Sequence, residues 1–190
     1  MDTLPLLGIA FGLAMDAFSV AVGIGFGLNK IRARQALRLS FHFGIFQFLM
    51  PIIGWLAGAT VANYISGFDH WIAFVLLSYV GGKMIYESFD DEADKYRGDP
   101  TRGMSLVMLS VATSIDALAV GLSMAMLKVS VLEPAVVIGV VAAAMSLAGV
   151  IIGRSTGKTA GKKLGPWMER FGGVVLLAIG LRILIEHLAG

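Results

Sequence analysis

The chain of 190 residues contains no cysteine, and only 15% of its residues carry a charge. Without cysteine it forms neither disulfides nor thiolate metal sites, and its charged fraction lies well below the roughly 25% of soluble domains. Hydrophobic residues instead make up 57% of the chain, and the mean hydropathy is +0.81. This composition predicts an all-α integral membrane protein. We expect no nucleic-acid partner and no enzymatic activity.

The polar sequence is interrupted by six apolar runs, most of them near the roughly 20 residues that an α-helix needs to cross a bilayer. They predict six transmembrane helices, at residues 4–28, 39–59, 71–86, 103–127, 132–152 and 171–188. The longest polar stretch separates the third run from the fourth. We therefore expect a three-helix unit at 1–89, a charged cytoplasmic linker at 90–102 and a second three-helix unit at 103–190. No cleavable signal sequence is predicted, because residues 1–3 contain no basic side chain.

Basic residues are concentrated in the loops after the first, third and fifth runs, which hold twelve of the fifteen Lys and Arg side chains. Because Lys and Arg are enriched in the cytoplasmic loops of membrane proteins, these three loops are predicted to be cytoplasmic. Both termini are then predicted to be periplasmic.

The two halves of the chain match one another at a nearly constant offset. The matching positions are separated by 99 or 100 residues: Asp16 and Asp116, Gly54 and Gly153, Gly58 and Gly157, and the motifs Gly81-x-Lys83-x-x-x-Glu87 and Gly180-x-Arg182-x-x-x-Glu186. Each half has an odd number of predicted spans, so the second copy must enter the membrane in the opposite orientation. Inverted repeats of this kind place the substrate site near the bilayer midplane, where the copies meet.

Asp16 and Asp116 each lie near the middle of a predicted span. An ionised carboxylate at the bilayer centre costs about 2.5–3.5 kcal/mol on insertion scales, and such residues usually mark an ion or proton pathway. Ser19 and Thr113 lie three residues from the aspartates on the same helix faces, and Gln47 lies near the middle of the second span. Their oxygen atoms suit hard cations such as Mg²⁺, Ca²⁺ and Mn²⁺. We therefore predict a divalent-cation site built from these five residues; the alternative is that the aspartates make structural hydrogen bonds.

Other features have two interpretations each. His42 is either a ligand or an interfacial or gating residue, and it lies about 140° around the helix from Gln47. The repeated motif contains basic and acidic partners that form either gating salt bridges or local helix pairs: Lys83 with Glu87, and Arg182 with Glu186. A glycine recurs at every fourth position, which indicates close helix packing and leaves homodimerisation through this ridge open: Gly149, Gly153, Gly157, Gly161 and Gly165.

Four segments carry a family resemblance: residues 15–18 (MDAF), 71–77 (WIAFVLL), 81–87 (GGKMIYE) and 112–121 (ATSIDALAVG). With them the chain resembles, over essentially its whole length, the MntP family of manganese efflux pumps, which is related to the LysE-type exporters. The resemblance implies a multi-pass protein of the bacterial inner membrane that exports Mn²⁺ and needs both aspartates. It implies no cofactor, because Mn²⁺ is the transported substrate. Some relatives carry an acid where this chain has Gln47.

A secondary transporter coupled to protons is the predicted mechanism. Two buried carboxylates that lie close together repel each other, so protons are held at the empty site and displaced by a divalent cation. Export against a negative-inside potential costs about 2.3 kcal/mol per charge per 100 mV, so a passive channel would run inward. The alternatives are an exporter of another divalent or small organic cation, or a cation channel. An intramembrane aspartyl enzyme is disfavoured, because no Gly-x-Gly-Asp motif surrounds either aspartate.

Overall fold

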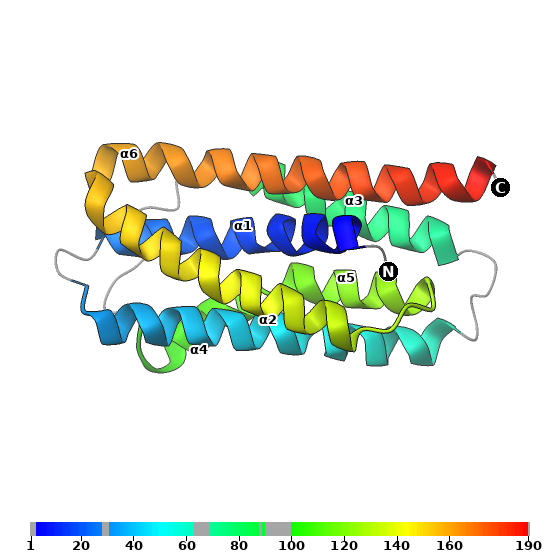
Figure 1. Ribbon diagram of the computed structural model, residues 1–190, viewed down its shortest axis with the longest axis horizontal. Coiled ribbons are helices and arrows are strands. Elements are labelled where there is room, and N and C mark those ends of the chain that lie inside the picture. Colours follow the sequence, from blue (N-terminus) through cyan, green and yellow to red (C-terminus); the bar gives the residue numbers. More distant parts are fainter. Residues whose placement is uncertain (1–2, 28–30, 63–68, 88, 90–99, 190) are drawn as a thin grey trace.

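The computed structural model describes residues 3–27, 31–62, 69–87, 89 and 100–189, and within these ranges the chain is helical, with no strand (Figure 1). The helices are α1 (Thr3–Gly27), α2 (Ala33–Ala62), α3 (Asp69–Glu87), α4 (Gly103–Ala112), α5 (Ile115–Met126) and α6 (Leu132–Ala189). The predicted all-α class is confirmed for these parts of the chain. Most of the predicted linker 90–102 lies outside them.

Three segments are each long and apolar enough to cross a membrane, namely Leu4–Gly25, Ala33–Thr60 and Leu132–Ser155. Helices α4 and α5 meet the same condition together, as one span bent by 41°. The chain is therefore a multi-pass membrane protein. The predicted spans 71–86 and 171–188 are helical, in α3 and α6, but do not meet this condition within the described residues. The six-span arrangement thus stays a prediction.

Helix α6 corrects one prediction from the sequence. Residues 153–170 contain five basic side chains and were expected to form a loop, yet their backbone belongs to α6. Lys and Arg are good helix formers, so a basic segment that marks the membrane boundary need not leave the helical conformation. Figure 1 shows that α6 nevertheless reverses direction where its colour passes from yellow to orange, which gives a first part and a returning part.

Helix α1 lies against both parts of α6. It runs parallel to the first part, because Gly149 packs on the backbone of Phe18 and Gly153 on that of Val22. It runs antiparallel to the returning part, whose Leu176 meets Gly12 and whose Ile179 meets Gly8. Gly149 and Gly153 belong to the predicted glycine ridge, and their role in helix packing is confirmed. Since α1 covers these two glycines, they are not available to a second copy of the chain.

Helices α2 and α5 form a second close pair, which corresponds to the pair of α1 and the first part of α6. A Cβ atom on Gly54 of α2 would collide with the carbonyl group of Leu118 in α5, and one on Gly121 with that of Pro51. The far end of α5 is also tied to α2, because Trp55 Nε1 donates a hydrogen bond to Val129 O at 2.8 Å. A glycine of the second predicted span in each half thus contacts the aspartate-bearing helix of the other half.

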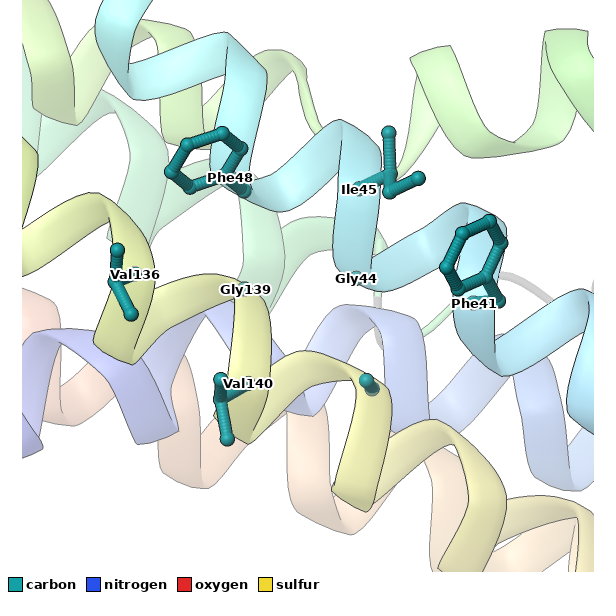
Figure 2. A pocket seen from close by; sticks show the side chains of 8 residues that line it. Phe41, Gly44, Ile45, Phe48, Val136, Gly139 and Val140 are labelled. Atoms are coloured by element: carbon teal, nitrogen blue, oxygen red, sulfur yellow. The ribbon is translucent and has the colours of Figure 1, made fainter.

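The first part of α6 crosses α2 where both helices have glycine (Figure 2). Gly44 and Gly139 face each other there, and a Cβ atom on Gly44 would lie 2.8 Å from the Cβ atom of Ala143. Gly44 and Ala143 are separated by 99 residues, which is the offset of the sequence repeat. The crossing leaves an open groove of about 250 Å³ with apolar walls, lined by Phe41, Gly44, Ile45, Phe48, Val136, Gly139, Val140 and Ala143.

The buried core joins α1, α3, α5 and both parts of α6 through one hydrophobic cluster. It includes Leu13 and Met15 of α1, Leu77 of α3, and Ala117 and Val120 of α5. Large apolar side chains also cover the outside of the bundle, among them Leu4, Phe41, Tyr79, Val140 and Leu181. Such a surface suits hydrocarbon rather than water.

Candidate cation site at a broken helix

The fourth predicted span is broken immediately before Asp116. Helix α4 ends at Ala112 and α5 begins at Ile115, although the sequence predicted one continuous helix from 103 to 127. Hydroxyl groups at the break occupy the carbonyl that would continue the helix, because Ser114 N bonds to Val111 O while Ser110 O accepts side-chain hydroxyls. Thr113 Oγ1 donates to Leu109 O and Ser110 O, and the Ser114 hydroxyl donates to Ser110 O. Hydroxyl groups that bond to the preceding turn compete with the helical backbone and bend helices.

Gln47 of α2 lies against this break and is 1% exposed. Its Nε2 donates a hydrogen bond to Thr113 O at 2.9 Å. Because the amide nitrogen is engaged, the orientation of the amide is fixed and Oε1 faces the other way. This buried oxygen accepts no hydrogen bond from the described residues. A buried acceptor without a donor is costly in a protein interior and suits a cation.

Asp116 lies in the first turn of α5 and its side chain is only 4% exposed. The N-terminal end of a helix carries a partial positive charge, which favours a carboxylate at this position. Lys83 of α3 reaches the same carboxylate, with its Nζ 3.1 Å from Oδ1. The sequence left Lys83 either in a gating or symmetry-related salt bridge or in a local pair with Glu87, and it did not identify Asp116 as its partner. The repeated motif around Lys83 indicated that the lysine matters, but a sequence motif does not identify a partner 33 residues away.

Asp16 and Ser19 lie on α1, which is continuous through both positions. Ser19 Oγ donates to Met15 O at 2.8 Å within the helix, and the Asp16 residue is half-buried. The neighbours of the two aspartates, Met15 and Ala117, belong to the same hydrophobic cluster. The structure thus groups three of the predicted ligands, Gln47, Thr113 and Asp116, at the break, and it places Asp16 and Ser19 on a helix that shares their core.

The oxygen atoms around the break determine which ions this candidate site could bind. They comprise the Asp116 carboxylate, the Gln47 amide and the Thr113 hydroxyl, beside the carbonyl end of α4. No three His, Cys, Asp or Glu side chains are grouped closely enough to hold a metal ion in the described part of the chain. A cation bound here would therefore draw on amide, hydroxyl or backbone oxygens besides carboxylates, a donor set that suits hard cations.

Two other candidates from the sequence lie elsewhere. His42 Nδ1 is 2.9 Å from Arg38 O, one turn back on its own helix, and its ring packs edge-on against Phe41. Arg182 is exposed and lines a surface pocket with Leu4 and Pro5 at the start of α1. The side chains of Glu87 and Glu186 lie outside the described residues, so their predicted pairing is not tested.

Comparison with known proteins assigns the family. The family described as "putative manganese efflux pump" matches residues 30–184. The chain belongs to the MntP family. A relative named putative manganese efflux pump MntP from Syntrophotalea carbinolica is 55% identical over 191 residues, which covers all of both chains. MntP relatives of the same name from Geobacter sp. (57% identical, 98% of each chain) and Nitratidesulfovibrio vulgaris (51%, 98% of this chain and 92% of the relative) are also similar. No solved structure matches.

Proposed function

We propose that this chain exports Mn²⁺ across the bacterial inner membrane as a secondary transporter. The observation that carries the proposal is the broken span, where the buried Asp116 carboxylate and Gln47 Oε1 lie beside the break in a member of the MntP family. Discontinuous helices that surround a buried ionisable group are a common way for secondary transporters to build an ion site. The names of the relatives supply the identity of the metal, because oxygen chemistry alone does not choose manganese.

The depth of the break agrees with a midplane site. Helix α4 has ten residues and is therefore about 15 Å long. That length is half of a hydrocarbon core of about 30 Å, so Thr113 and Asp116 fall near the middle of the membrane if α4 begins at its surface.

The reciprocal glycine contacts support the inverted repeat of two three-helix units. Gly54 of the first half packs on Leu118 of the second, and Gly153 of the second half packs on Val22 of the first. Gly44 meets its repeat counterpart Ala143, as expected near a pseudo-twofold axis. In this arrangement the basic loops are cytoplasmic, both termini are periplasmic, and Asp16 joins Asp116 as the second carboxylate, with Ser19, Thr113 and Gln47 as further oxygen ligands.

Proton exchange is the coupling that this site favours. Carboxylates held near one another in a membrane interior need a counter-charge when the metal leaves, and protons supply it. Export of a divalent cation against a potential of 100 mV costs about 4.6 kcal/mol, so a coupled antiporter fits better than a passive channel. If metal flux in proteoliposomes proceeds with no opposing proton movement, this coupling is wrong.

The decisive experiment is Mn²⁺ uptake into inside-out vesicles by the unaltered protein, Asp16→Asn and Asp116→Asn. Asparagine keeps the size and one oxygen of each side chain and removes its charge. We expect uptake by the unaltered protein and a loss of at least about 100-fold in both variants at equal membrane abundance, which is more than the loss of an outer-shell partner usually causes. Normal uptake by the variants would make the aspartates structural. Competition by other divalent metals, or by organic cations, distinguishes the alternative substrates.

A further inference from the structure

Lys83 is a cation in direct contact with the proposed metal ligand. It projects from α3 toward the start of α5, and its Nζ lies 3.1 Å from Asp116 Oδ1. The two side chains differ in exposure, with 27% for Lys83 and 4% for Asp116. The carboxylate is thus fixed inside the protein, while the lysine approaches it from a more open side.

The ammonium group and a metal ion cannot both occupy this side of Asp116. Hard divalent cations such as Mg²⁺ and Ca²⁺ contact carboxylate oxygens at about 2.0–2.6 Å. With Nζ at 3.1 Å from Oδ1, a cation bound to the same oxygen would lie within a few ångströms of a second positive charge. Repulsion at that distance is strong where water is scarce. A metal ion at Oδ1 therefore competes with the Lys83 ammonium for this carboxylate.

Lysine is suited to such competition. Its ammonium is a compact charge on a flexible four-carbon stem, whereas arginine grips a carboxylate through a planar fork of two donors. About a quarter of the Lys83 side chain is exposed, so it is less enclosed than the carboxylate that it contacts.

We propose that Lys83 is a tethered cation that competes with the transported metal for Asp116. When the metal is bound, Lys83 withdraws; when the metal leaves, the ammonium returns and neutralises the carboxylate. Lys83 then compensates Asp116 in the empty site, and the proton of the proposed coupling compensates Asp16, so the transporter can return without metal. This inference rests on the proposed function and adds that Lys83 determines metal affinity and favours net export over metal exchange.

The test compares Mn²⁺ binding by the purified full-length protein with that of three variants. Lys83→Gln removes the competing charge, so its dissociation constant for Mn²⁺ should fall by about tenfold or more, as coupling between close charge pairs indicates. Lys83→Arg should weaken Mn²⁺ binding, because the fork holds Asp116 more firmly. Arg182→Gln is the matched control, since Arg182 holds the corresponding place in the sequence repeat but lies beside Leu4 and Pro5; its affinity should not change.

Transport gives a second measurement that a purely structural lysine would not produce. Lys83→Gln vesicles should still exchange internal for external Mn²⁺, while their net uptake falls relative to exchange. Equal or weaker Mn²⁺ binding by Lys83→Gln would overturn the inference. If that variant fails to fold, Lys83→Arg decides, and equal or tighter binding by it rejects competition. Failure of the unaltered protein to bind or transport Mn²⁺ would instead reject the proposed function, whatever the Lys83 variants do.

Discussion

Asp16 and Asp116 occupy similar stretches of sequence 100 residues apart, but α1 continues through Asp16 whereas the helix of Asp116 is broken just before it. The residues upstream of the two aspartates differ in their hydroxyl groups. The second stretch has Ser110, Thr113 and Ser114, and all three bond to carbonyls of the preceding turn. The corresponding positions of the first stretch are Ala10, Leu13 and Ala14, which form no such bonds and favour an uninterrupted helix. The aspartate-bearing span is therefore one continuous helix in the first half and two helices joined at a bend in the second half.

The largest effect should come from giving the second half the residues of the first. In Ser110→Ala/Thr113→Leu/Ser114→Ala, the competing hydroxyls are gone and the span should straighten. Straightening a 41° bend between arms of about 15 and 18 Å lengthens the span by about 2 Å. Because the chain has no cysteine, spin labels on Met104→Cys and Ser130→Cys measure this distance directly. Mn²⁺ uptake should be lost; an unchanged distance would show that the hydroxyls do not cause the break.

A smaller loss of Mn²⁺ uptake is expected when Gln47 is replaced, and none when Ser146 is replaced. Ser146 holds the corresponding position in the second half. Gln47→Leu removes both the bond to Thr113 O and the unengaged Oε1, and we expect a 10- to 100-fold loss of Mn²⁺ uptake, roughly that of losing a supporting group at a metal site. Ser146 Oγ only donates to Ala142 O on its own helix, so Ser146→Ala should transport normally. Equal losses in the two variants would contradict the assignment of the site to the break.

The smallest effect is a loss of stability when the close glycine contacts that both halves share are disturbed. Gly54 and Gly149 pack on the carbonyl groups of Leu118 and Phe18, two residues after each aspartate. Gly54→Ala and Gly149→Ala should each lower the free energy of unfolding by about 1–3 kcal/mol through overpacking, measured as thermal unfolding in detergent. Gly82→Ala is the control, because no atom of another described segment lies within 4 Å of its Cβ position. If only one of the two glycines is sensitive, the helix pairs are not equivalent.

Hydropathy was sufficient to predict the helices but not their interruptions. A window of about 20 residues averages over Thr113 and Ser114, so the break was invisible although the hydroxyls that cause it are plain in the sequence. The basic segment 153–170 was assigned to a loop because charge reports position relative to the membrane, not backbone conformation. Asp116, Gln47 and Thr113 were predicted as ligands from their chemistry and spacing, and that role stays a prediction. Lys83 could not be paired with Asp116, because that contact depends on how α3 packs against α5.

The two hydrogen bonds from α2 to the α5 region have a mechanical consequence. Gln47 holds the backbone just before α5, and Trp55 holds it just after, while Gly54 and Gly121 allow the helices to touch between these points. Helix α5 is thus clamped along its whole length to a helix from the other half of the sequence. If a rocking motion takes place, α2 and α5 move together as one block. That block contains helices from both halves of the sequence.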